Sequence, residues 1–293
     1  MYQTGIFDET PTHHFFLEYV LADGADRASV ASCIATLSRV VDPARMVLAF
    51  GTGLARQLFC EAVPADFSDF EPITGKQQTV PATPRDLWVW VHADNSSDAL
   101  DAMLAVHEVA QSAFDLALDV AGFRYHDSRD LTGFVDGSAN PKGDARHAAA
   151  LVQTGPATAG SIVFTQRWEH NLTAFHALAT SEQERVIGRT KPDSIELEGD
   201  AMPADSHVSR TDLKVNGVPM KIYRRSVPFA SAKHQGLYFL AFTTERRRID
   251  VILAHMFGTS DDKVTDRLTQ YSKPSTGAFW FAPSQAALAS VGG

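Results

Sequence analysis

The nine residues at positions 133–141, GFVDGSANP, place a single carboxylate in a segment that cannot continue a helix or a strand. Gly133 and Gly137 allow backbone angles that are closed to other residues and let another backbone or a flat ligand approach closely. Pro141 prevents a helix from running through the segment. The segment is therefore predicted to be a loop that presents Asp136, although an ordinary Asp-Gly turn has the same local pattern.

The first half of the chain alternates short strands with longer helices. Strands are predicted at residues 14–22, 46–50 and 87–92, the last because it combines β-branched and aromatic residues. Helices are predicted at 25–41 and 97–120, the second from apolar residues at helical spacing behind a Ser-Ser-Asp cap.

The second half repeats this arrangement loosely. Strands are predicted at 161–168, 220–227 and 237–243, with a helix opening at a capping box at 181–184 and an amphipathic helix at 245–257. This order favours an α+β sandwich in each half. The predicted division is an N-terminal half at 1–140, a linker at 141–160 and a C-terminal half at 161–293.

Length and charge limit the class of protein. The 293 residues and the 44% hydrophobic content are enough for two domains with buried cores. The net charge of −9 argues against nonspecific binding to nucleic acid, which needs a basic face. Cys33 and Cys60 lie in apolar surroundings and predict buried thiols rather than a disulfide or a zinc site. The sequence contains no signal peptide and no stretch of about 20 apolar residues, so we expect a cytoplasmic protein.

Five stretches, in order, resemble the dye-decolorizing peroxidases, a family of heme enzymes, and in particular their bacterial B-type members. They are the GxxDG pattern at 133–137, QRWEHNL at 166–172, IGRTK at 187–191, DSHVSR at 205–210 with DLK at 212–214, and KIYRRSVP at 221–228, which leads into GLYF at 236–239. The resemblance is close over residues 120–283 and extends to the N-terminal half only in pattern.

The resemblance implies two ferredoxin-like halves with antiparallel sheets and a heme b cofactor. It implies an enzyme that uses hydrogen peroxide to oxidise dyes, phenols and other one-electron donors, and a homo-oligomer. Two alternatives remain: a heme-handling protein of the deferrochelatase kind, and a ligand-binding or assembly protein of ferredoxin-like build without heme. The C-terminal residues 286–293 show no convincing version of the longer tail by which some members dock into a protein shell, so encapsulation is not expected.

A heme needs an axial donor, and the chain has eleven histidines. His207 stands apart because it lies between an acidic loop and a polar strand, in the stretch that matches the proximal histidine of the family. The resemblance therefore implies that His207 is the axial ligand of the heme iron.

Peroxide cleavage needs a group that moves a proton from one peroxide oxygen to the other, and a cation that stabilises the departing oxygen. Asp136 suits the first role. The resemblance assigns the second to Arg224, with Arg225 as the alternative, because alternation along a strand points the two to opposite faces. Ser226 would face the same side as Arg224 and could hold a water molecule or the arginine in place.

Further groups are expected around the cofactor. Asp266 is the candidate acceptor for the other ring nitrogen of the histidine, with Asp261 and Asp262 still possible. Arg189 and Thr190 could bind the heme propionates, and Gly137 would let the porphyrin approach. Weaker candidates, which can equally be packing residues, are His170, Asn171, Met256 and Phe257 in the pocket and Tyr125, Tyr271 and Trp280 for electron transfer over a distance.

Overall fold

The computed structural model describes residues 1–292 and has an α+β fold built on one ten-stranded antiparallel sheet. The sheet strands are β1 (His13–Leu21), β2 (Met46–Phe50), β5 (Leu87–Ala93), β6 (Phe114–Phe123), β7 (Ser161–His170), β10 (Tyr223–Arg224), β11 (Val227–Ala230), β12 (Gln235–Thr243), β13 (Ser272–Pro274) and β14 (Ala278–Ala282). Two small ribbons pair β3 (Ile73–Thr74) with β4 (Thr79–Val80) and β8 (Lys214–Val215) with β9 (Val218–Pro219).

Helices flank this sheet. They are α1 (Arg27–Val40), α2 (Thr52–Phe59), α3 (Ser96–Ala110), α4 (Asp144–Ala150), α5 (Leu172–His176), α6 (Thr180–Ile187), α7 (His207–Thr211), α8 (Arg247–Met256) and α9 (Gln285–Ala289). Short 3₁₀ turns lie at Thr4–Phe7, Cys60–Ala62, Gly199–Ala201, Arg267–Gln270 and Ser290–Gly292. Among the described residues, no helix combines the length and the apolar character needed to cross a membrane.

The sheet passes through both halves of the chain and curls back toward itself. Its strand order is β10-β12-β7-β14-β2-β5-β1-β6, with β14 meeting β2 at the pair Phe281 and Phe50. At the two ends, Gly122 of β6 lies so close to β11 that a Cβ atom there would be 2.6 Å from Val227 Cγ2. The curl therefore brings a strand of the first half against a strand of the second.

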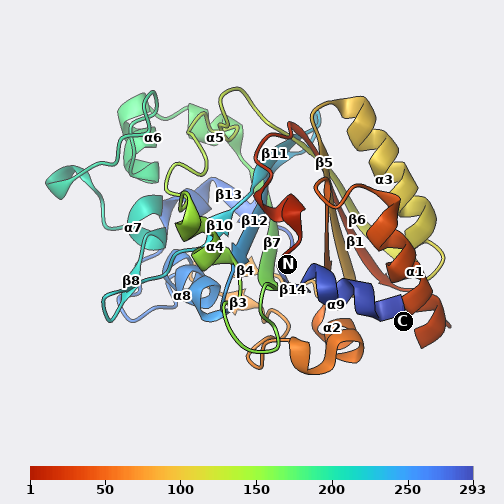
Figure 1. The fold of residues 1–293 in the computed structure, drawn as a ribbon. Helices are drawn as coiled ribbons and strands as arrows, with labels where there is room; N and C mark the ends of the chain where they lie inside the picture. The colour runs from red at the N-terminus through yellow and green to blue at the C-terminus, as the bar shows by residue number, and fades with distance from the viewer. Residues whose placement is uncertain (293) are drawn as a thin grey trace.

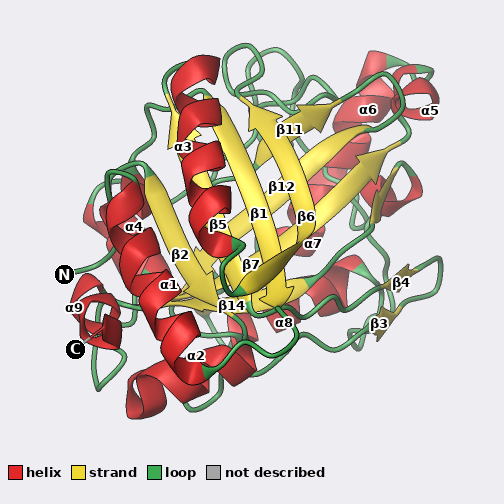
Figure 2. Cartoon of the chain, turned by 90° about the vertical axis from the view of Figure 1, so that its right-hand side faces the viewer, coloured by secondary structure: helices red, strands yellow, loops and turns green. Residues whose placement is uncertain are grey.

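Alternation along the strands divides the core into two layers. Trp88 and Trp90 of β5 join an inner cluster with Tyr238 and Trp280, which come from the second half. The intervening residues of β5 face an outer cluster that includes the buried faces of α1, α3 and α8. Figures 1 and 2 show α1 and α3 side by side across the strands of the first half, with α5 to α8 gathered near the second half. The inner cluster is thus shared by both halves.

The structure confirms the α+β class and most predicted strands, but the prediction of one helix over 97–120 was wrong. The helix is α3, capped by the Asn95 side chain, and it ends at Ala110. Residues 114–123 form β6, with Phe114, Val120 and Gly122 buried and the residues between them mostly exposed. Apolar residues at 114 and 118 satisfy a helical period as well as the two-residue period of a strand, which explains the error.

Three smaller predictions are corrected. The capping box fails because α6 begins after Ala179 without a side-chain cap. The strand at 220–227 breaks into β10 and β11, since the Ser226 hydroxyl accepts from the Leu240 amide at 3.3 Å and replaces a ladder bond. Cys33 is buried as expected, but Cys60 is exposed. The segment at 141–160 contains the short helix α4.

Candidate active site

A cavity lies on the outer face of the second half of the sheet. Alternate residues of β7 form one wall, namely Phe164, Gln166, Trp168 and His170, and Leu237 and Phe239 of β12 extend it. Apolar residues of α8 line it as well, with Ile249, Ile252, Leu253 and Met256. The cavity has a volume of about 1490 Å³, counting its open mouth. Its walls are mainly apolar, and the polar groups that enter it come from a few elements.

His207 enters the cavity from the first residue of α7. The helix starts there because the Ser206 hydroxyl caps it, accepting from the Ser209 amide at 3.3 Å. His207 Nδ1 lies 2.6 Å from Oδ2 of Asp266, which is fully buried. A carboxylate at Nδ1 fixes the proton there and leaves Nε2 with a free lone pair. The ring is therefore held as a nitrogen donor inside an apolar cavity.

The geometry separates two of the three candidate carboxylates, Asp266 and Asp262. Asp266 bonds the ring of His207 and also accepts from the Leu268 amide at 2.9 Å. Asp262 is instead bound by both terminal nitrogens of Arg210, at 2.7 and 2.9 Å. These hydrogen bonds from Arg210 are the main reason that the pKa of Asp262 lies well below its usual range.

Asp136 lies in a tight loop, as the sequence predicted for residues 133–141. Gly133 and Gly137 have φ angles of 90° and 75°, which favour glycine. The backbone amide of Asp136 donates to Ser128 O at 3.0 Å, and its Oδ1 accepts from the Gly137 amide at 2.7 Å. The side chain lines the cavity and also a second, polar cleft beside it.

Arg224 and Arg225 point to opposite faces of the sheet. Arg224 lines the cavity, and its hydrogen bonds within residues 1–292 are both made by its backbone. Arg225 is turned inward, where it donates to the carbonyls of Ile6 and Asp8 and lies 4.9 Å from the centre of the Trp90 ring. The guanidinium of Arg224 is the one that faces the cavity.

Asn140 connects the loop of Asp136 to the strand of Arg224. Its side chain donates from Nδ2 to Arg224 O at 2.7 Å and accepts from the Arg224 amide at 3.0 Å. This pair of bonds imitates a β-bridge between a loop and a strand. No role was predicted for Asn140, because the order of residues does not indicate which backbone its side chain meets.

The other residues predicted to bind the cofactor do not all line the cavity. Arg189 lines the cavity but pairs with Glu196 at 2.6 Å. Thr190 is not among the lining residues, because its hydroxyl accepts from the Ile195 amide within its own loop at 3.0 Å. Gly137 and Ser226 line the neighbouring cleft rather than the cavity. Thr190, Gly137 and Ser226 therefore lie outside the lining of this cavity, and their role beside the porphyrin stays a prediction.

Two polar groups of the cavity wall lacked a clear sequence signal. Asp130 Oδ1 lies 3.1 Å from His170 Nε2, and His170 Nδ1 lies 2.7 Å from the Ser272 hydroxyl. Burial opposes ionisation of Asp130, but the nearby His170 and the bonds from Thr132 outweigh it and lower the pKa of Asp130. Gln166 is buried, and its Nε2 has no hydrogen-bond partner within the described chain.

The weaker candidates take mixed positions. Met256 lines the cavity, and Phe257 stacks on Trp168 with ring centres 6.0 Å apart. Asn171 caps α5 through its side chain. Trp280 is fully buried in the inner cluster and donates to the Thr165 hydroxyl. Tyr271 packs edge-on against Phe175, and Tyr125 lies beside His126.

The residues of this cavity suit a heme. A flat, apolar macrocycle needs long apolar walls, one axial nitrogen and a few polar groups at its edge. The walls of β7, β12 and α8 supply the first, His207 the second, and Arg189 and Arg224 part of the third. The fold and the cavity define an α+β protein whose cavity could hold a flat, apolar cofactor, with one histidine available to bind it.

The chain belongs to the Dyp-type peroxidase family and is a heme peroxidase. Residues 25–124 match the model of the N-terminal domain of Dyp-type peroxidases, and residues 127–287 match the model of the C-terminal domain. The chain is 33% identical over 283 residues to a dye-decolorizing peroxidase of Mycolicibacterium paratuberculosis, covering 92% of this chain and 80% of that protein. These matches do not favour the heme-handling alternative.

Solved structures agree in fold over nearly the whole chain. The dye-decolorizing protein from Vibrio cholerae has a TM-score of 0.90 and 35% identity, covering 98% of this chain and 99% of that one. A variant of DypB from Rhodococcus jostii RHA1 in complex with heme has a TM-score of 0.89 and 31% identity, covering 97% and 98%.

Proposed function

We propose that this protein binds heme b in the cavity through His207 and reduces hydrogen peroxide at the expense of dyes, phenols and other one-electron donors. The observation that supports this most directly is the hydrogen bond between His207 and the buried Asp266, which directs the other ring nitrogen of His207 into a cavity that also contains Asp136 and Arg224. When bound, heme supplies an iron centre that accepts the oxidising equivalents of peroxide and passes them on one electron at a time.

The residues of the chain handle the protons and the charge. In this proposal Asp136 takes a proton from one peroxide oxygen and returns it to the other. Its carboxylate lines the cavity and accepts from the Gly137 amide through one oxygen, which supports this role. Arg224 is placed to stabilise negative charge on the departing oxygen. Asp266 accepts a hydrogen bond from the ring of His207, which makes the ring a stronger electron donor and holds its orientation.

Arg189 is our candidate for a heme propionate, although its pairing with Glu196 means that the propionate would share the guanidinium. His170 and Ser272 offer further polar contacts at the wall. We further propose a cytoplasmic homo-oligomer and retain the division into halves at 1–140 and 161–293 with a linker at 141–160. In that division Asp136 comes from the first half, and His207, Arg224 and Asp266 from the second.

Heme reconstitution followed by absorption spectroscopy tests this assignment. We expect the parent to bind one heme per chain and to react with one equivalent of peroxide. Asp136→Asn and Arg224→Leu should bind heme normally and react more slowly by about 100-fold or more, the size expected from loss of an acid-base or charge-stabilising group.

His207→Ala should lose the absorption of a histidine-ligated heme, and added imidazole should restore it. His255→Ala is the matched control, because His255 lies nearby on α8, bonds the Val251 carbonyl and does not line the cavity. Normal histidine ligation in His207→Ala would reject the axial role, and a parent that takes up no heme would reject the whole assignment.

A further inference from the structure

A second, polar cleft adjoins the cavity and shares Asp136 and Arg224 with it. We call it the arginine cleft. It has a volume of about 1290 Å³, counting its open mouth, and its lining includes Pro11, Tyr125 and Pro228. The cleft is large enough for an organic molecule with one ring, and its proline and tyrosine side chains offer apolar surface for such a ring.

The charges of the arginine cleft are unbalanced. Six cationic side chains line it, which are Arg124, Arg129, Lys142, Arg146, Arg224 and Arg225, against the carboxylates of Glu9 and Asp136. Arg129 pairs with Asp127 at 2.8 Å, and Arg146 lies 3.6 Å from Glu9. Counting Asp127 as a third carboxylate, a formal excess of three positive charges remains. This excess is local, since the chain as a whole carries a net charge of −9.

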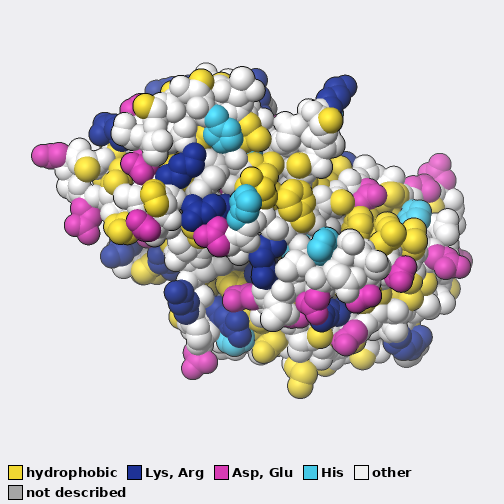
Figure 3. All heavy atoms as spheres, turned by 90° about the horizontal axis from the view of Figure 1, so that it is seen from above, with side chains coloured by type: hydrophobic (Ala, Val, Ile, Leu, Met, Phe, Trp, Pro, Cys, Tyr) yellow, Lys and Arg dark blue, Asp and Glu magenta, His cyan; other side chains and the backbone are white. Residues whose placement is uncertain are grey.

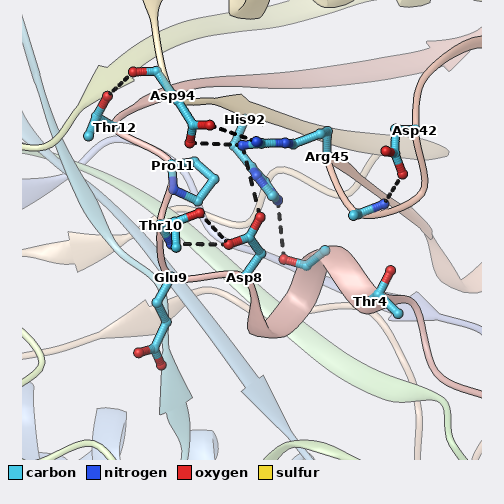
Figure 4. Close-up of polar contacts among 12 residues, drawn as sticks. Thr4, Asp8, Glu9, Thr10, Pro11, Thr12, Asp42, Arg45, His92 and Asp94 are labelled. Atoms are coloured by element: carbon cyan, nitrogen blue, oxygen red, sulfur yellow. Dashed lines mark hydrogen bonds and ion pairs between the residues drawn. The ribbon is translucent and has the colours of Figure 1, made fainter.

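The N-terminal segment forms a fixed wall of this cleft. Arg124 donates through Nη2 to the carbonyls of Glu9, Thr10 and Pro11 at 2.6, 3.1 and 3.1 Å. Figure 4 shows Asp8 bonded to Thr10, with Glu9 pointing away from that group. Carbonyl oxygens hold Arg124 in place, and no carboxylate among residues 1–292 forms an ion pair with it.

Two further observations point to a ligand. Nε of Arg146 is buried and has no partner in the described part of the chain. The guanidinium of Arg224 is likewise without a side-chain hydrogen bond among residues 1–292. His14 also lines the cleft, but burial, followed by the charges of His92 and Arg225, lowers the pKa of His14 and keeps it neutral. Figure 3 shows acidic and basic side chains interspersed over the face of the molecule seen from above.

We propose that the arginine cleft binds small aromatic carboxylates and so selects anionic phenols as one-electron donors. Cationic groups in a cleft with low-dielectric walls attract anions, and a guanidinium binds a carboxylate through paired hydrogen bonds. The role in donor selection rests on the proposed peroxidase function. In the balanced reaction, two phenols each give up one electron and one proton, and one hydrogen peroxide becomes two water molecules.

Binding of a redox-inert probe tests the site without turnover. We would titrate the heme-loaded protein with 4-fluorobenzoate and, in parallel, with the neutral 4-fluorobenzyl alcohol, and follow both by fluorine NMR. We expect the carboxylate to bind about tenfold more tightly at 20 mM salt, with the difference reduced at 500 mM salt because screening weakens charge attraction.

The variant Lys142→Glu with Arg146→Gln should raise the Kd of 4-fluorobenzoate at least about tenfold, which corresponds to 1.4 kcal/mol. Lys142→Glu alone should give a smaller rise and covers the case in which loss of the Arg146 pair affects folding. The control Arg39→Glu with Arg185→Gln changes the net charge equally at positions outside both cavities, and it should leave the Kd within about twofold.

Equal affinity for the two probes, or unchanged affinity in the Lys142 and Arg146 variant, would overturn the proposal. So would a change of the heme absorption spectrum on adding the probe, because it would place the carboxylate at the iron. Peroxide turnover with a neutral phenol is measured on the same samples, so that failure of the anion site and failure of the peroxidase assignment give different results.

Discussion

Replacing Glu18 with Gln should change how the stability of this protein depends on pH. Glu18 lies on β1 and is fully buried, with Oε1 accepting from the Tyr238 hydroxyl at 3.0 Å and Oε2 lying 3.1 Å from Arg85 Nε. Burial raises the pKa of Glu18 from 4.5 to about 7, although Arg85 and Tyr238 oppose the shift. The folded protein therefore holds this proton more tightly than the unfolded chain does.

The sign of the effect follows from proton linkage. The protonated Glu18 stabilises the fold fully below about pH 4.5, and this stabilisation is lost as the pH rises toward 7. The loss amounts to about 3 kcal/mol, since each pKa unit corresponds to about 1.36 kcal/mol. A glutamine stays neutral at every pH. The difference in unfolding free energy between the parent and Glu18→Gln should therefore move by about 3 kcal/mol in favour of the variant between pH 4.5 and pH 8.

Urea unfolding at a series of pH values measures this difference. Urea is preferable to guanidinium chloride because it leaves the ionic strength unchanged. The absolute stability of the variant is not the test, since its new amide also alters the contact with Arg85. Glu108→Gln, at an exposed position on α3, is the control and should give a constant difference. A constant difference for Glu18→Gln as well would refute the assignment of a buried, weakly acidic carboxyl at this position.

Three further predictions concern the site and the sheet. Asn140→Ala removes two hydrogen bonds to the backbone of β10, worth about 1 kcal/mol each, so the rate constant for reaction with peroxide should fall about tenfold while heme affinity is kept. An unchanged rate would show that these two bonds do not position Arg224. Asp266→Asn should weaken heme binding by about 10- to 100-fold, measured by transfer of heme to apomyoglobin, and unchanged transfer would separate Asp266 from the axial ligand. Gly236→Ala should lower the unfolding free energy by more than about 3 kcal/mol in urea, because its Cβ would lie 1.7 Å from Trp168 O; a stable variant would show that β7 and β12 can shift apart.

The sequence predicted correctly those segments whose residue pattern is typical of only one type of secondary structure. The strand at 87–92 was found because its β-branched and aromatic residues exclude a surface helix, and β5 occupies Leu87–Ala93. The segment at 114–123 failed because its apolar spacing satisfies two periods at once. The break between β10 and β11 depends on a side chain of one strand bonding the backbone of another, which no local pattern can indicate.

The candidate site could also be predicted only in part from the sequence. Motif resemblance singled out Asp136, Arg224, His207 and Asp266, and the structure brings the first three to one cavity, with Asp266 bonded to His207. Thr190 followed Arg189 in the motif, yet its hydroxyl closes its own loop. Position in a motif thus indicates that a segment borders a site, while the direction of each side chain depends on hydrogen bonds made after the chain has folded.

The curl of the sheet connects the fold to the proposed chemistry. Asp136 follows β6, at one end of the strand order, while Arg224 lies on β10, at the other. The two residues can share a cavity because β6 and β11 meet at Gly122 and Val227, and because Asn140 then bonds the backbone of Arg224. If the eight strands from β10 to β6 lay flat, roughly seven spacings of about 4.8 Å would separate the two ends. Any change that opens this junction should therefore slow the reaction with peroxide before it releases heme, since His207 and Asp266 belong to a different part of the cavity wall.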